Sequence, residues 1–428
     1  MRERCAWWET IGPLGPPNPV QGDKDVDAAV IGGGFTGLAC ARRLAELEPG
    51  QAIALIDSTR IGAANSGLNS GFLLDVSFYD DLPPAVQASR NRLQTAGLKD
   101  LERLVQTLGI DCDWRPWGNL YGAFIEPELA LLDDLATRYS RHGAAVEFWD
   151  SERMTEVTGS PVMRRGVFHP GTVLVQPAKL VRGLAANLPP SVTVHEESPV
   201  TRYHRKKERY VLETPLGRVS ARRLFVCNNG GAPELGFGRS RLVPVTTFAA
   251  VTQPLSGLDR LLDTIEPFGM LPTLTGGPTI RMLPECRFLV RSDFVFTRNR
   301  VPTKTETERF VMNAKENLER RWPSLRHYRW AFEHVWHGVM SLTRNTASVF
   351  GRMDDGVYVS AFCNGAGNTA GSSAGRLLAE LDFGRESDLL ADQLSLPQPT
   401  WVPPDFLLAP YVSREIARTT KALRRIYG

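Results

Sequence analysis

The stretch that decides the fold runs from Val26 to Asp57 and reads VDAAVIGGGFTGLACARRLAELEPGQAIALID. Its first six residues are almost all apolar, as expected of a parallel strand that is buried on both faces. The glycine turn GGGFTG follows at 32–37, and apolar residues then recur at helical spacing until Pro49 and Gly50 end the helix. A second apolar run leads to Asp57. This order of strand, turn, helix, strand and acid predicts a dinucleotide-binding βαβ unit.

The glycines and the acid of this unit each have a physical role in holding a dinucleotide. Gly32 permits the tight turn, Gly34 lets the backbone approach a pyrophosphate, and Gly37 lets the helix pack closely on the sheet. The helix N-terminus adds free N–H groups and partial positive charge, which suit phosphates. Asp57 lies 20 residues beyond Gly37, where a carboxylate can bind a ribose hydroxyl and would repel the 2′-phosphate of NADP.

Two further segments favour FAD over NAD as the dinucleotide. Residues 58–72, STRIGAANSGLNSGF, have too few apolar side chains for a core strand but can wrap a polar ligand, with an ordinary surface loop as the alternative. Residues 357–381 repeat the pattern of apolar strand, glycine turn (364–369) and helix. The N-terminus of that helix would stabilise the negative charge of a reduced flavin, with Asn368 or Thr369 as its N-cap.

Composition excludes several classes of protein. The chain has 428 residues, 42% hydrophobic and 23% charged, which is typical of a globular protein of two or three domains. A net charge of +3 is too balanced to predict nucleic-acid binding. We expect no membrane-spanning helix and no secretory signal, because no apolar stretch is long enough. The six cysteines form no CxxC pair, so we expect no metal site and a reduced, cytoplasmic enzyme.

The chain resembles the FAD-dependent oxidoreductases of the D-amino-acid-oxidase-like superfamily, and most of all the branch that contains gamma-glutamylputrescine oxidase. The resemblance extends over nearly the whole chain. It rests on Trp7-Trp8, VIGGGFTGL at 30–38, SGLNSGF at 66–72, LGIDCDW at 108–114, QPAKL at 176–180, WHGV at 336–339, Arg344-Asn345, Phe350-Gly351 and the glycine turn at 364–369.

This resemblance implies an extended, non-covalently bound FAD. The adenosine would lie on the first βαβ unit, flanked by 192–200, and the flavin ring would lie against the turn at 364–369. Segment 224–230 would form a strand and a turn near the dinucleotide. The expected cofactor contacts are Gly32, Gly34, Phe35, Thr36, Gly37, Asp57, Ser58, Asn65, Ser66, Gly67, Leu68, Asn69, Ser70, Val200, Asn228, Gly230, Gly351, Asn364, Gly365, Ala366, Gly367, Asn368 and Thr369.

Several positions depart from the family pattern. A basic residue commonly stands where this chain has Leu68, and a histidine where it has Ala366. Arg291 and Ser292 replace a glycine pair that often ends a strand, and the carboxylate-binding arginine of amino acid oxidases would fall near Met340. Because these changes gather around the expected flavin, the substrate or the flavin chemistry can differ from that of the best-known relatives.

Few catalytic groups are needed to oxidise an amine, because the protein must mainly hold the substrate C–H over the flavin and keep its nitrogen unprotonated. His337 is the best histidine for an active-site base, with a structural histidine as the alternative. Arg344 and Asn345 lie close to the flavin by family analogy. Arg291 is a candidate for binding a substrate anion or stabilising the flavin, with a surface strand residue as the alternative.

The expected fold is α/β, with a Rossmann-like FAD-binding domain interleaved with an α+β substrate domain built on an antiparallel sheet. The FAD domain would comprise 20–80, 165–235 and 340–385. The substrate domain would comprise 81–164 and 236–339, and 386–428 would form a C-terminal tail that packs on the protein.

The leading functional hypothesis is an FAD-dependent oxidoreductase that takes hydride from the C–N carbon of an amine or amino-acid-like substrate, giving an imine. Oxygen or an electron carrier would then accept the electrons. The alternative is a specialised flavin enzyme, catalysing desaturation or hydroxylation of a natural product or modified amino acid. A flavin-binding protein without catalysis and an NAD-only dehydrogenase are the further alternatives.

Overall fold

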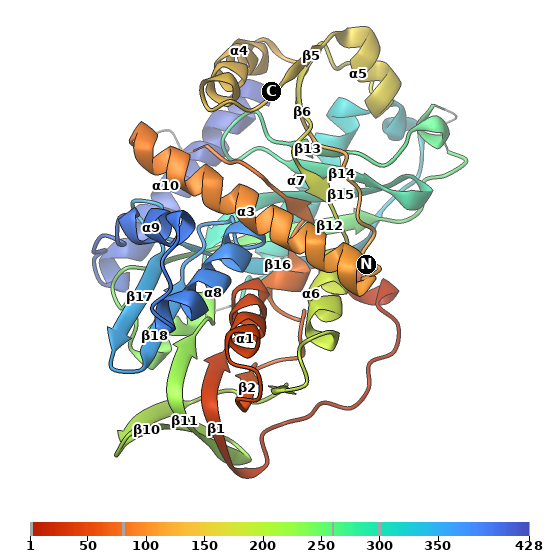
Figure 1. The fold of residues 1–428 in the computed structure, drawn as a ribbon. Coiled ribbons are helices and arrows are strands. Elements are labelled where there is room, and N and C mark those ends of the chain that lie inside the picture. The colour runs from red at the N-terminus through yellow and green to blue at the C-terminus, as the bar shows by residue number, and fades with distance from the viewer. Residues whose placement is uncertain (1–2, 79–81, 259–260, 298–300, 428) are drawn as a thin grey trace.

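The computed structural model describes residues 3–78, 82–258, 261–297 and 301–427. Within these residues the strands form two eight-stranded sheets and a two-stranded ribbon of β3 (Phe72–Leu73) and β7 (Val173–Leu174). The first sheet occupies the lower half of Figure 1 and the second sheet the upper half. Along the chain, blocks of strands from the first sheet alternate with blocks of strands from the second sheet.

The first sheet carries the βαβ unit in the order β17-β18-β11-β1-β2-β8, with the antiparallel strands β10 and β9 continuing from β11. Its central pairs, from β8 to β18, are parallel, as in a Rossmann-like sheet. The strands are β1 (Gly22–Ile31), β2 (Ile53–Ile56), β8 (Val192–His195), β9 (Arg202–Lys206), β10 (Arg209–Thr214), β11 (Gly217–Val226), β17 (Val349–Asp354) and β18 (Val357–Ala361).

The second sheet has the order β16-β12-β15-β14-β13-β4-β6-β5 and is antiparallel except for the pair β13 and β4. Its strands are β4 (Asn119–Ala123), β5 (Glu147–Trp149), β6 (Arg165–His169), β12 (Val243–Thr252), β13 (Gly269–Leu271), β14 (Thr279–Leu283), β15 (Arg287–Phe296) and β16 (Phe332–Leu342). One boundary differs from the expected one. β6 pairs antiparallel with β4, so residues 165–169 belong to the second sheet rather than to the FAD-binding segment 165–235.

The helices cover the sheets and fill the space between them. They are α1 (Phe35–Leu47), α2 (Asn65–Leu68), α3 (Pro84–Leu108), α4 (Glu126–Arg141), α5 (Ser151–Thr158), α6 (Pro177–Ala186), α7 (Lys304–Arg321), α8 (Thr369–Asp382), α9 (Asp388–Ser395) and α10 (Asp405–Tyr427). α1 and α8 pack side by side on the first sheet, and α3 crosses over α8 (Figure 1). α7 packs on one face of the second sheet.

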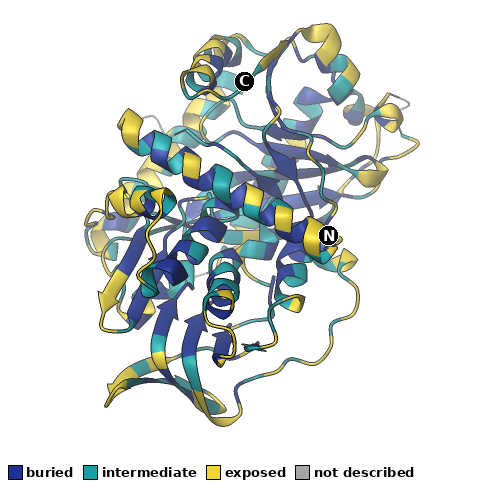
Figure 2. Cartoon of the chain, in the orientation of Figure 1, coloured by how far each residue is buried: buried dark blue, intermediate teal, exposed yellow. Residues whose placement is uncertain are grey.

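Burial follows these layers, with the middles of the strands buried and the outer helix faces exposed (Figure 2). One core lies between the first sheet and α1, α3, α6 and α8, and a second lies between the second sheet and α7. Within the described residues, no helix is both long enough and apolar enough to span a bilayer. The C-terminal residues fold into α9 and α10, and α9 packs on α3 through Asp392, which accepts hydrogen bonds from Ser89 and Arg92.

Candidate active site

The glycine turn between β1 and α1 is so tightly packed that two of its positions accept no side chain. Gly32 has a φ of +106°, and a Cβ there would lie 2.7 Å from the carbonyl oxygen of Cys227. A Cβ on Gly37 would lie 1.8 Å from the carbonyl oxygen of Gly32. Gly34 is the N-cap of α1 and makes no side-chain capping bond. The N–H of Phe35 donates to Ser66 Oγ at 3.4 Å, and the N–H groups of Thr36 and Gly37 in the same turn can face a ligand.

Asp57 stands at the carboxyl end of β2, beside this turn. Its Oδ2 accepts a hydrogen bond from the backbone N–H of Gly33 at 2.7 Å, and its Oδ1 accepts from both the N–H and the hydroxyl of Thr59. These bonds fix the direction of the carboxylate, and its remaining lone pairs can accept from a ribose hydroxyl. The next residue, Ser58, is exposed.

The turn after β11 contributes an unsatisfied polar atom next to the glycine turn. The buried Oδ1 of Asn228 has no hydrogen-bond partner within the described part of the chain, and the Cα of Asn228 lies 2.9 Å from where a Cβ on Gly32 would stand. Buried acceptors are nearly always paired, so this atom indicates a place for a ligand. Asn229 instead accepts from the N–H groups of Phe362 and Cys363, and so ties this turn to the second one.

The loop at 65–70 and the turn at 364–369 meet through a pair of amides nearly 300 residues apart in sequence. Asn69 Nδ2 donates to Asn368 Oδ1 and Asn368 Nδ2 donates to Asn69 Oδ1, each at 3.2 Å. Asn65 Nδ2 donates to the carbonyl of Val339 on β16 at 2.5 Å. The loop at 65–70, strand β16 and the turn at 364–369 therefore meet at one place.

The second glycine turn begins with a fully bonded residue and ends in an uncapped helix. Asn364 accepts from the N–H of Thr343 and donates to the carbonyls of Ala347 and Phe362. Asn368 is the N-cap of α8, as expected, but its side chain bonds to Asn69 and not to the helix. No side chain caps α8, and its N-terminus carries partial positive charge that favours an anion, although the N–H of Ala370 already donates to the carbonyl of Ala366.

α1 and α8 approach each other closely because α8 presents glycines to α1. A Cβ on Gly371 would lie 2.8 Å from Thr36 Oγ1, and a Cβ on Gly375 would lie 1.9 Å from the carbonyl oxygen of Thr36. The two helix N-termini therefore point into the same region, and their partial positive charges add there.

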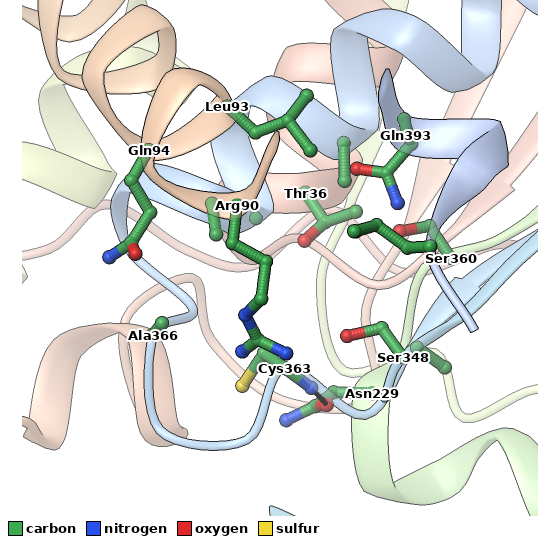
Figure 3. Close-up of a pocket in the computed structure, with 15 residues that line it drawn as sticks. Thr36, Arg90, Leu93, Gln94, Asn229, Ser348, Ser360, Cys363, Ala366 and Gln393 are labelled. Carbon is green, nitrogen blue, oxygen red and sulfur yellow. Dashed lines mark hydrogen bonds between the residues drawn. The ribbon is translucent and has the colours of Figure 1, made fainter. Parts of the chain in front are cut away.

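A cavity adjoins this region on the side of α3 (Figure 3). Arg90 reaches into it from α3 toward Cys363 and Asn229, and its Nη1 donates to the carbonyl of Thr346 at 2.6 Å. Burial raises the pKa of the Cys363 thiol, so this sulfur is protonated. The lining also includes Thr36, Leu93, Gln94, Ser348, Ser360, Ala366, Gly371 and Gln393. Sequence reasoning missed Arg90 and Gln94, since they follow no motif on α3.

Arg291 lies on the face of the second sheet that looks toward the first. Arg291 pairs with Ala249 on β12, and Ala249 pairs in turn with Trp336 on β16. Trp336 Nε1 donates to the carbonyl of Leu68 in the loop at 65–70. Burial lowers the pKa of Arg291 to about 10. Its guanidinium donates to Thr279 Oγ1 at 2.9 Å, and no carboxylate among the described residues pairs with it.

Another arginine, the buried Arg281, holds the loop at 65–70 in place. Its Nη1 donates to the carbonyls of Ser70 and Val175, each at 2.8 Å, and its guanidinium lies between the rings of Trp7 and Phe72. Burial lowers its pKa to about 9. Sequence reasoning missed Arg281, because nothing local marks a strand arginine that bonds a loop about 200 residues away.

The comparisons with known proteins agree with this geometry. The family model of the FAD dependent oxidoreductases (DAO) matches residues 27–381. The chain belongs to this family. It is 26% identical to the gamma-glutamylputrescine oxidoreductase of Escherichia coli, over 83% of each chain. It is 25% identical to a probable oxidoreductase, OrdL, of Rhizobium meliloti, over 92% of this chain and 91% of the other.

The solved structures show the same fold. Glycine oxidase from Geobacillus kaustophilus superposes with a TM-score of 0.71 at 20% identity, over 85% of this chain and 96% of that chain. Iminodiacetate oxidase from Chelativorans superposes with a TM-score of 0.68 at 18% identity, over 87% of this chain and all of the other. The predicted Rossmann-like domain with a substrate domain is confirmed.

As a member of the DAO family, the chain is an FAD-dependent oxidoreductase of the amine and amino acid oxidase type. Its residues fit the cofactor, because the uncapped N-termini of α1 and α8 and the unsatisfied Oδ1 of Asn228 lie where polar ligand atoms would need donors and acceptors. In this fit, Asp57 would hold the ribose, the start of α1 the pyrophosphate, and the turn at 364–369 the flavin.

The predicted catalytic residues of this family member do not all come together. His337 lies on the face of β16 opposite to Trp336, with its ring edge-on to Phe248, which stacks on Phe310 of α7. Burial lowers the pKa of His337, although part of its ring remains exposed. Its ring therefore lies on the side of the sheet that α7 covers, away from Arg291.

Arg344 and Asn345 lie in the turn between β16 and β17. Arg344 is exposed, and Asn345 donates to the carbonyl of Gln398 and accepts from the N–H of Thr400, holding the linker before α10. Neither residue lines the cavity of Figure 3.

Two of the predicted cofactor residues pack in apolar clusters. Leu68 packs against the cluster that contains Trp336 and Trp7, and Val200 packs against the core cluster of the first sheet.

Proposed function

We propose that the chain oxidises the C–N bond of an amine or amino-acid-like substrate that also carries an anionic group, giving an imine. FAD, when bound, supplies the two-electron acceptor, with the flavin N5 receiving the hydride. The observation that supports the anionic group is Arg291, a half-buried cation without a carboxylate partner among the described residues, on the face turned toward the loop at 65–70. A carboxylate of the substrate would supply the missing charge.

The roles of the protein in this reaction are binding, orientation and exclusion of water. Arg291 would anchor the anion, and the sheet face around Thr279 and Phe294 would direct the substrate carbon toward the turn at 364–369. No side chain needs to remove a proton from carbon, because the electrons leave with the hydrogen as hydride.

The test is an anaerobic titration of the holoenzyme with matched amines, each with and without a carboxylate, while the visible flavin band is followed before air is admitted. Bleaching by one class and recovery in air supports an oxidase, and bleaching that only a carrier reverses supports a dehydrogenase. If no amine bleaches the flavin, the proposal fails.

The contribution of Arg291 is tested by Arg291→Gln with steady-state kinetics. We expect KM for a carboxylate-bearing substrate to rise by about ten- to a hundredfold, because a charge-assisted hydrogen bond contributes about 1.5–3 kcal/mol. The matched control is Arg287→Gln on the same strand, where the guanidinium is already paired with Glu333 at 2.6 Å. Equal KM values in both variants would contradict the assignment.

The second candidate is desaturation or hydroxylation of a natural product or modified amino acid. It is supported by Ala366, an apolar residue that lines the cavity of Figure 3 at a position where the family resemblance leads us to expect a histidine. Incorporation of isotope-labelled oxygen into the product would favour hydroxylation over simple oxidation.

All six cysteines are free thiols, which supports our expectation of a reducing, cytoplasmic setting.

A further inference from the structure

α10 presents two different faces, one packed on the protein and one turned to solvent. At 3.6 residues per turn, positions 408, 412, 416, 419, 423 and 427 form one stripe. Leu408 is buried, Thr419 and Leu423 lie against Gly276, and the Tyr427 hydroxyl donates to Glu128 Oε1 at 2.6 Å. This stripe fixes the helix to the second sheet and α4, along the path seen in Figure 1.

The opposite stripe is exposed along its whole length. It consists of Leu407, Tyr411, Arg414, Arg418, Lys421 and Arg425. Its N-terminal end is apolar: the exposed fractions are 56% for Leu407, 65% for Tyr411, 75% for the adjacent Phe406 and 57% for Trp401. Four large apolar side chains so exposed within eleven residues mark an interaction surface rather than chance exposure.

The remainder of the stripe is strongly basic. Arg414, Arg418, Lys421 and Arg425 are exposed, and no carboxylate among the described residues forms an ion pair with any of them. On this stretch of the helix Glu415 is the single acid, and it lies at the edge of the stripe. Because the whole chain has a net charge of only +3, four aligned cations are a local feature and not a general property of the surface.

We propose that this face of α10 docks the protein on an anionic lipid bilayer. From Leu407 to Arg425 the stripe spans about 27 Å at 1.5 Å per residue, and its members lie on one side of the helix, so they can face one plane. The four cations would meet lipid phosphates, and Trp401, Phe406 and Tyr411 would enter the interface, where such side chains are favoured. A symmetric contact between two copies would instead bring like charges together.

The experiment uses flotation of the holoenzyme with vesicles of phosphatidylcholine, with and without about a third of phosphatidylglycerol, at low and high salt. We expect flotation with the anionic vesicles only, and less at high salt. Replacing the four cations by R414Q/R418Q/K421Q/R425Q should lower the partition coefficient by about a hundredfold or more, at about fivefold for each charge. F406S/L407S/Y411S should remove the flotation that survives high salt.

Matched variants control for charge and apolar surface in general. K206Q/K207Q/R218Q/R222Q removes four exposed cations from the far edge of the first sheet, and L216S/M312S/M353S removes three exposed apolar side chains elsewhere. Flavin content and melting temperature confirm folding of each variant. The proposal is overturned if the wild type floats equally with neutral vesicles, or if the control and α10 variants lose flotation equally. It is also overturned if vesicles do not bind and α10 instead holds an acidic protein or a second copy.

Discussion

The contact between α8 and α1 makes Gly375→Ala the most informative single substitution. In an isolated helix, alanine would stabilise by about 1 kcal/mol relative to glycine. Here the new Cβ would stand 1.9 Å from the carbonyl oxygen of Thr36, whereas ordinary contact requires at least about 3.4 Å. The two helices must therefore separate by more than about 1 Å, since a backbone carbonyl cannot rotate away as a side chain can.

This separation costs packing along the whole contact between the helices. Overpacked core substitutions cost about 1–3 kcal/mol and at times more, and the helix preference of alanine offsets about 1 kcal/mol of this, so we expect a net loss of up to about 2 kcal/mol in the free energy of unfolding. The shift also moves the N-terminus of α1, where the pyrophosphate would bind. We expect the dissociation constant for FAD to rise at least about tenfold, because the helix N–H groups no longer converge.

The measurements are urea unfolding of the apoprotein and FAD titration by quenching of flavin fluorescence. Gly15→Ala is the matched control, since a Cβ at Gly15 meets nothing within 4 Å and its backbone φ is ordinary for any residue. The reasoning is refuted if Gly375→Ala unfolds at the wild-type urea midpoint and binds FAD as tightly as Gly15→Ala does.

Three further predictions concern single contacts. Asp57→Ala should weaken FAD binding by about ten- to a hundredfold, through loss of a charge-assisted hydrogen bond, with Asp57→Asn closer to wild type in the same titration. Arg281→Met should lower the free energy of unfolding by about 2–5 kcal/mol, because two buried carbonyls lose their donor; unchanged urea midpoints would count against this. The pKa of His169 is raised, because burial, which lowers it, is outweighed by the hydrogen bonds to Asp75 and to Ala145. A raised folded-state pKa gives stability that is fully present below about pH 6.5 and is lost as the pH rises through the folded-state value. Urea midpoints measured from pH 5.5 to 8.5 should therefore fall more in the wild type than in His169→Gln.

Sequence reasoning succeeded where the determining contacts are local. The tight turn at Gly32, the close packing at Gly37 and the acid at Asp57 follow from spacing within about 30 residues, and the structure has β1, α1 and β2 where these signals place them. The second glycine turn was recognisable for the same reason. The contact of this turn with the loop at 65–70 was not predictable, because the amide pair of Asn69 and Asn368 exists only once two distant segments have folded together.

The side chains that the second sheet presents to the site could not be predicted, because the face on which a strand residue lies depends on how its strand pairs with its neighbours. The pairing of β12 with β15 shifts at Thr247 and Phe248, and Asp293 bulges out with a φ of +52°. Arg291 and His337 lie on different strands, and a shift of one residue in the pairing would reverse the face of one relative to the other, so alternation along the sequence cannot place them relative to each other. Only the completed sheet shows that they lie on opposite faces.

The charges of the site explain why so few catalytic groups are needed. The N-termini of α1 and α8 and the guanidinium of Arg291 all bring positive charge to the region between the sheets. Asp57, which accepts a hydrogen bond from the glycine turn, would lie at the adenosine end of the bound cofactor. Such a field favours anions and lowers the pKa of a bound ammonium group. Because only the neutral amine can release hydride readily, the same charges that would hold phosphate and a substrate anion would also help the substrate to lose its nitrogen proton, and no histidine base is required.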